Sequence, residues 1–98
     1  MFVILTSRPG QYHTEIGDGM RPCETYHYQF CGQTKARFDI VALLRDVKIR
    51  IVDETPPARI NDIPSKFLPR FATLEEARAQ LQSLVSFRGV DATLLRLS

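Results

Sequence analysis

The feature that most constrains the fold is a strict alternation of side-chain type from Glu24 to Cys31. Aromatic residues occupy every second position, with polar residues between them: Tyr26, Tyr28 and Phe30 against Thr25, His27 and Gln29. Because successive side chains of a β-strand point to opposite faces, this pattern predicts a strand with one buried and one solvated face. Residues 47–52 alternate in the same way and predict another strand.

Residues 35–43 fit two templates. Apolar residues at every second position favour a strand: Ala36, Phe38, Ile40 and Ala42. The spacing of Ala36, Ile40, Leu43 and Leu44 also fits a helix. We favour a strand, because its alternation continues into residues 47–52, and the helix stays open as the alternative.

The register between residues 24–31 and 35–43 should be the one that buries the apolar side chains of both strands. Pairing residue 30 with residue 35 would set the aromatic face against charged side chains. A slip of one residue instead pairs apolar residues, namely Phe30 with Ala36, Tyr28 with Phe38 and Tyr26 with Ile40. His27 then lies opposite Asp39, and Gln29 lies opposite Arg37. This register requires a bulge or odd loop around residues 32–34, where Gly32 can supply the unusual backbone conformation.

The remaining elements complete an α+β domain that spans residues 1–98. Residues 2–7 predict a strand ended by Pro9-Gly10, 12–16 a short edge strand, and 91–97 a last strand. Thr73 and Glu76 form a capping box for an amphipathic helix that ends before Gly89. Residues 53–72 hold four prolines and predict a long, ordered Pro-rich loop. The expected fold is a mostly antiparallel sheet of 4–6 strands with the C-terminal helix on one face.

The cellular compartment is inferred from short apolar runs and sparse cysteines. Residues 2–5 are too few for a signal-peptide core or a membrane span. Cys23 and Cys31 form neither a CxxC motif nor a disulfide-rich pattern. We therefore expect a cytoplasmic protein with free thiols and no membrane contact.

Positive charge is concentrated in one segment. The chain has 13 Lys and Arg against 11 Asp and Glu, a net charge of +2, and the whole positive excess lies in residues 35–52, which hold five basic and two acidic residues. A hairpin of residues 35–43 and 47–52 would place Lys35, Arg37, Lys48 and Arg50 on one sheet face. Such a face could dock an acidic protein surface, although a solvated face that only maintains solubility is the simpler interpretation. The aromatic residues fall on the other face, which disfavours nucleic acid as a partner.

No motif predicts catalysis, a cofactor or a metal. The nucleotide-binding, HExxH, calcium-loop and GxSxG patterns are absent. His13, Cys23, His27 and Cys31 are ligand types that suit zinc. His27 and Cys31, however, would lie about 13 Å apart on one strand, so only a fold-back of residues 8–23 could complete a site. His27 opposite Asp39 is the best acid–base candidate, with a surface pair as the simpler interpretation.

The leading functional hypothesis is a non-enzymatic accessory or protein-interaction module. Its cationic hairpin would bind an acidic protein, such as a subunit or an electron-transfer protein, through Lys35, Arg37, Lys48 and Arg50. The alternative is a small enzyme or metabolite-binding domain. Its pocket, between the sheet and the 53–72 loop, would use His27, Asp39 and either Tyr12 or His13. Weak nucleic-acid binding is the third hypothesis. We expect a monomer or a homodimer.

Overall fold

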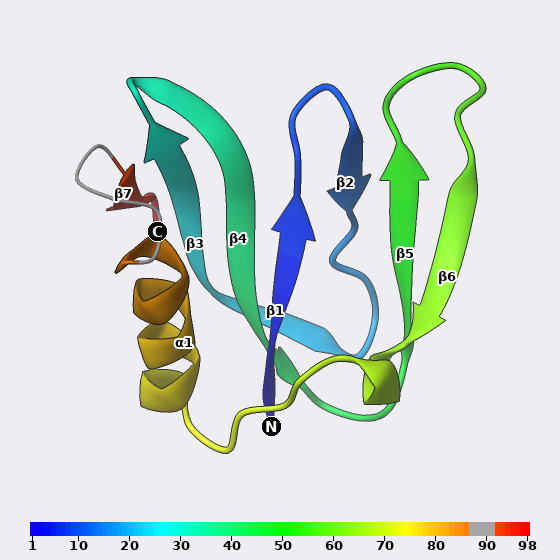
Figure 1. Ribbon diagram of the computed structural model, residues 1–98. Coiled ribbons are helices and arrows are strands. Elements are labelled where there is room, and N and C mark those ends of the chain that lie inside the picture. The colour runs from blue at the N-terminus through cyan, green and yellow to red at the C-terminus, as the bar shows by residue number, and fades with distance from the viewer. Residues whose placement is uncertain (87–91) are drawn as a thin grey trace.

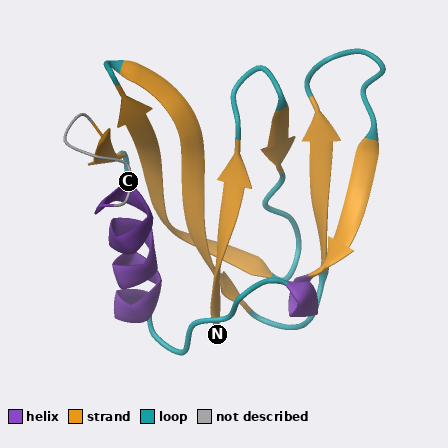
Figure 2. Cartoon of the chain, viewed as in Figure 1, coloured by secondary structure: helices purple, strands orange, loops and turns teal. Residues whose placement is uncertain are grey.

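The computed structural model describes residues 1–86 and 92–98. Within these residues the chain forms seven strands in two antiparallel sheets, one α-helix and a short 3-10 helix (Figures 1 and 2). The four-stranded sheet has the order β1 (Phe2–Ser7), β4 (Gln33–Leu43), β3 (Met20–Phe30) and β7 (Ala92–Arg96). The three-stranded sheet has the order β2 (Tyr12–Thr14), β5 (Lys48–Asp53) and β6 (Ile60–Pro64). The α+β class with a C-terminal helix is confirmed, whereas one sheet of 4–6 strands is not.

Two hydrophobic cores lie on opposite faces of the four-stranded sheet. On one face, Ala77 and Leu81 of α1 (Leu74–Ser86) pack against residues of β4 that include Phe38 and Ile40. On the other face, Ile49 of β5 packs in a cluster with Val3, Leu5, Met20 and Val41. Because neighbouring side chains of β1 and β4 point to opposite faces, these two strands contribute to both cores.

The predicted helix and its N-terminal cap are confirmed. The Glu76 N–H donates to Thr73 Oγ1 at 3.1 Å, as a capping box requires. The Glu76 carboxylate accepts instead from the N–H of Ala72 at 3.1 Å, one residue before the expected donor. The predicted end of the helix before Gly89 and the first residue of the predicted last strand, Asp91, lie outside the described residues.

The strand interpretation of residues 35–43 is correct, but the expected partners in the β3–β4 hairpin are wrong by two residues. Tyr28 pairs with Ala36, and His27 lies opposite Arg37 rather than Asp39. The reason is a tight turn at Cys31 and Gly32, whose φ angles are 52° and 76°. Two positive φ angles are typical of two-residue hairpin loops, so the strands close sooner than expected. A shift of two residues preserves the faces, and Tyr26 and Tyr28 are partly buried against the core beneath α1, whereas Phe30 belongs to neither core.

The expected bulge is present, one residue later than predicted. Gln29 pairs with Thr34 while Tyr28 pairs with Ala36, so Lys35 is the extra residue on β4. A similar shift between Pro22 and Glu24 leaves Cys23 as an extra residue on β3. Each bulge reverses the face on which the following alternation falls.

The hairpin expected between residues 35–43 and 47–52 is wrong. β4 pairs with β1 along one edge and with β3 along the other, so no edge is left for β5. β5 instead pairs with β2 and with β6. The predicted edge strand at residues 12–16 therefore exists as β2, but in the second sheet.

The loop predicted at residues 53–72 is also wrong in part. Residues 60–64 pair with β5 as β6, and Ser65–Phe67 form the short 3-10 helix η1. The alternation rule missed β6 because polar Asn61 and Asp62 are adjacent in its centre. Within the described residues, no helix is long and apolar enough to cross a membrane.

Candidate functional site

The four predicted cationic residues lie on three different surfaces. Lys48 and Arg50 are exposed on β5, and Ile49 between them is buried toward the four-stranded sheet. Arg50 Nε lies 3.2 Å from Asp62 Oδ1 of β6. Lys35, turned by the bulge, lines a pocket beside α1, whereas Arg37 lines a cleft on the opposite face of the four-stranded sheet. The predicted single cationic face therefore does not form.

The cleft that contains Arg37 lies between the four-stranded sheet and β2. Its volume is about 650 Å³, within the usual range for ligand sites. Its ionisable lining comes from both sheets and from the residue after β5: Tyr12, His13, His27, Arg37, Asp39 and Glu54. Four of these residues, His27, Asp39, Tyr12 and His13, are those that the metabolite-binding hypothesis named. Only Glu54 of the 53–72 segment lines this cleft, whereas that hypothesis placed its pocket between the sheet and the whole segment.

Asp39 is buried and holds Arg37 in place. Its side chain is only 4% exposed, while that of Arg37 is 48% exposed. Asp39 accepts from Arg37 Nε at 3.2 Å, from Arg37 Nη2 at 3.2 Å and from the Thr25 hydroxyl at 2.8 Å. A buried carboxylate needs such partners, because an unpaired one would be strongly destabilising. The pairing fixes one edge of the guanidinium and leaves its other N–H groups without a partner among the described residues.

Glu54 fixes the opposite rim of the cleft. One carboxylate oxygen accepts from the N–H of Gly10 at 2.8 Å, and the other lies 3.3 Å from His13 Nδ1. The second ring nitrogen of His13 lies 3.9 Å from Glu15. The carboxylates of the cleft are therefore engaged by donors of the protein itself.

The balance of donors and acceptors determines what the cleft can bind. Asp39 and Glu54 are both engaged, whereas the free edge of Arg37, the His27 ring and the Tyr12 hydroxyl have no polar partner among the described residues. A guanidinium edge can only donate, so the free edge of Arg37 is complementary to a ligand that carries acceptors. Arg in particular binds planar or tetrahedral oxyanions through two parallel hydrogen bonds.

His27 and Asp39 line the same cleft, but sequence reasoning missed two of their neighbours. Glu54 lies in a segment predicted as loop, and its role follows from the contact with Gly10, 44 residues away. Thr25 was placed on the correct face of β3, but the two-residue shift in register makes it, rather than His27, the residue opposite Asp39.

The four candidate zinc ligands do not converge. Across residues 1–86 and 92–98, no group of three or more His, Cys, Asp and Glu side chains is arranged to hold a metal ion. Cys23 lies at the β3 bulge, and Cys31 is exposed in the hairpin turn; both thiols are free.

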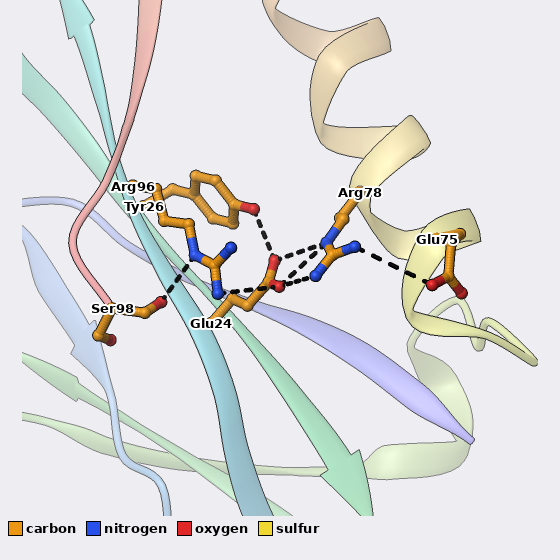
Figure 3. Close-up of polar contacts among 6 residues, drawn as sticks. All are labelled: Glu24, Tyr26, Glu75, Arg78, Arg96 and Ser98. Carbon is orange, nitrogen blue, oxygen red and sulfur yellow. Dashed lines mark hydrogen bonds and ion pairs between the residues drawn. The ribbon is translucent and has the colours of Figure 1, made fainter.

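A second buried carboxylate, Glu24, joins three elements on the helix side (Figure 3). It accepts from the Tyr26 hydroxyl at 2.6 Å and from Arg78 Nε of α1 at 2.9 Å, with a further contact to Arg78 Nη2. Arg96 Nη2 of β7 lies 3.3 Å away. The hydrogen bonds from Arg78 are the main reason that the pKa of Glu24 falls from 4.5 to about 2. Because every polar atom of Glu24 is engaged, we assign this cluster to structure rather than to ligand binding.

Burial, and then the bond to Glu24, raise the pKa of the Tyr26 hydroxyl. The bond to Glu24 likewise raises the pKa of Arg78. The phenol thus stays protonated, and the guanidinium charged, as donors to Glu24.

Comparison of the chain with protein families, with curated proteins and with solved structures finds no match in any of the three.

Proposed function

We propose that this protein is a small-molecule-binding domain whose ligand is a small oxyanion, a carboxylate or a phosphate, bound in the cleft between the two sheets. The observation that carries the proposal is the fixed guanidinium of Arg37, held on one edge by buried Asp39 and open on the other. His27 and Tyr12 line the same cleft and can donate to the same ligand. Preorganised donors favour binding, because less side-chain entropy is lost when the ligand arrives.

The test is titration of the isotope-labelled protein with phosphate, acetate and succinate at constant ionic strength, followed by amide chemical shifts. We expect shifts at residues of the cleft, such as His27, Thr34 and Arg37. Succinate or phosphate, each able to accept two parallel hydrogen bonds from Arg37, should bind more tightly than chloride. Comparison of the three probes distinguishes a carboxylate ligand from a phosphate ligand.

Arg50 provides a matched control for Arg37. Each arginine Nε lies 3.2 Å from an aspartate oxygen, and the two side chains are 51% and 48% exposed. Arg37→Ala should weaken anion binding about tenfold or more, the loss expected for a charge-assisted hydrogen bond. Arg50→Ala should leave it unchanged.

Arg37→Lys guards against a folding defect, because it keeps a cation beside Asp39 while removing the planar pair of donors. We expect a folded protein with weakened binding. If the Arg37 and Arg50 variants lose anion affinity equally, the anion is attracted non-specifically by positive charge and the proposed site is wrong. The absence of any anion-dependent shift in the cleft would end the proposal.

Docking of an acidic protein stays a prediction. The single cationic face on which that prediction was based does not form. The separate exposed cations Lys48 and Arg50 on β5 are what such a partner could still contact. Weak nucleic-acid binding, a cytoplasmic location and a monomeric or homodimeric state also stay predictions.

A further inference from the structure

A second pocket lies on the opposite face of the four-stranded sheet, beside the C-terminal end of α1. In Figure 1 the β3–β4 hairpin extends beyond this end of the helix. Ala77 and Leu81 are buried against the sheet, but Leu84, one turn further along, is 44% exposed. The pocket has a volume of about 660 Å³. It is thus large enough for a small organic ligand.

The floor of this pocket is apolar and largely aromatic. Tyr28 and Phe30 of β3 and Phe38 of β4 line it, and the Tyr28 and Phe38 rings are tilted by 31° with centroids 6.4 Å apart. Leu84 and Val85 of α1 form the wall. A ligand that fits this surface has an apolar body.

Two cations, Arg8 and Lys35, also line the pocket, and among the described residues no acidic side chain lines it. Lys35 reaches this face only because it is the extra residue of the β4 bulge; regular alternation would place it beside Arg37 on the opposite face. Bulges commonly redirect a side chain next to a binding site. Lys35 Nζ donates to Gln33 Oε1 at 3.0 Å, and Arg8 has no side-chain partner among the described residues.

We propose that this pocket binds an amphipathic monocarboxylate, with its apolar body on Tyr28, Phe30 and Phe38 and its carboxylate between Arg8 and Lys35. The apolar body removes hydrocarbon surface from water, and the two cations neutralise the head group. This site is separate from the cleft between the sheets and does not depend on the function proposed for that cleft.

The experiment compares octanoate, 2-naphthoate and neutral octanamide by amide chemical shifts and calorimetry. Octanoate or 2-naphthoate should shift Ala36, Phe38 and Leu84, and the tighter of the two identifies an alkyl or an aromatic body. Octanamide has the same chain without the charge and should bind about tenfold more weakly. If octanamide binds as tightly as octanoate, the cations do not select the ligand and the proposal is wrong.

Three variants locate the site. Lys35→Met keeps the apolar stem and removes the charge, so it should weaken octanoate about tenfold but leave octanamide unchanged. Leu84→Asp places a negative charge on the wall of the pocket and should weaken octanoate binding by repelling its carboxylate. Leu84 is exposed, so the substitution should affect folding little. Lys48→Met, on β5 of the other sheet, is the control and should bind as the wild type does.

Loss of affinity in Lys48→Met equal to that in Lys35→Met would overturn the proposal, as would carboxylate-induced shifts confined to the cleft between the sheets. Arg37→Ala separates the two proposals: it should weaken succinate binding in that cleft about tenfold or more and leave octanoate binding beside α1 unchanged. No shift around this pocket with any of the three probes would refute the second site, whereas the first site is tested by its own titration with succinate and phosphate.

Discussion

At the scale of single residues, Glu24 links stability to pH. Its pKa is lowered from 4.5 to about 2, so folding favours the charged form. The stabilisation is therefore complete above about pH 4.5 and is lost as the pH falls toward 2. We expect Glu24→Gln to reduce the free energy of unfolding at neutral pH by about 3 kcal/mol, because it leaves Arg78 and Arg96 without their buried carboxylate. Urea unfolding at pH 7 and at pH 3 measures the effect.

Glu75 is the control for Glu24, because it contacts the same arginine from an exposed position. Its carboxylate is 77% exposed and lies 4.0 Å from Arg78 Nη1. Glu75→Gln should change the free energy of unfolding by less than about 0.5 kcal/mol. The Glu24→Gln protein should also lose less stability between pH 7 and pH 3 than the wild type. An unchanged difference between these two pH values would show that Glu24 does not cause the acid sensitivity.

At a bulge, the alternation of the sequence no longer predicts the sheet face on which a side chain lies. Without the extra residue Cys23, alternation would put Glu24 on the same face as Met20, which packs in the core between the sheets. The bulge instead turns Glu24 toward Arg78 of α1. Lys35 is redirected in the same way. Alternation predicts which residues share a face, but it carries no signal for the position at which a long-range pairing shifts by one residue.

At the scale of elements, the start of β3 depends on a glycine. Gly19 has a φ of +81°, and an added Cβ would lie 2.5 Å from Val47 Cγ1. Gly10, in the β1–β2 turn, has nearly the same φ of +80° but open space around it. Gly10→Ala should therefore cost only the backbone strain of about 1–2 kcal/mol. Gly19→Ala should cost about 1–3 kcal/mol more, from overpacking against Val47. Thermal or urea unfolding of the two variants gives the difference, and equal costs would contradict the steric argument.

The cap of α1 provides a second prediction at this scale. Thr73→Ala removes the acceptor of the Glu76 N–H and should destabilise the protein by about 1 kcal/mol. Thr55→Ala, in the exposed connection between β5 and β6, is the control and should lie within about 0.5 kcal/mol of the wild type. Urea unfolding followed by circular dichroism measures both. A negligible effect of Thr73→Ala would mean that the hydrogen bond from the Ala72 N–H to the Glu76 carboxylate is enough to cap the helix without the Thr73 hydroxyl.

Most elements could be predicted from local pattern, but their partners could not. The alternation of residues 24–31 and 47–52 and the cap at Thr73 are local signals, and each marks an element that the structure contains. Which edge a strand uses depends on every other strand. β1 occupies the edge of β4 that β5 was expected to take, and β5 in turn pairs with residues 60–64, which have no strand pattern of their own. The predicted cationic face does not form for this reason, whereas His27 and Asp39 line one cleft because they lie on directly paired strands.

At the scale of the whole molecule, the two cores share their central strands. Adjacent residues of β4 are fully buried on opposite sides: Ile40 toward α1 and Val41 toward β5. A rigid common sheet separates the two proposed ligand sites, since Arg37 and Phe38 are also neighbours on β4 with opposite orientations. Neither core can lose its packing without disturbing strands that the other needs.

This sharing predicts that the chain unfolds as one cooperative unit, as the expectation of a single domain over residues 1–98 requires. Leu81→Ala should destabilise the protein by about 2–5 kcal/mol through the cavity it leaves under α1. Native-state hydrogen exchange then discriminates the alternatives. If unfolding is cooperative, Leu81→Ala lowers the protection free energy of the amides in β5, on the far side of the molecule, by as much as that of the amides in β4. Ile49→Ala should act equally on both strands from the other side. If β5 keeps its protection in Leu81→Ala, the three-stranded sheet is a separate unit and only the four-stranded sheet folds with α1.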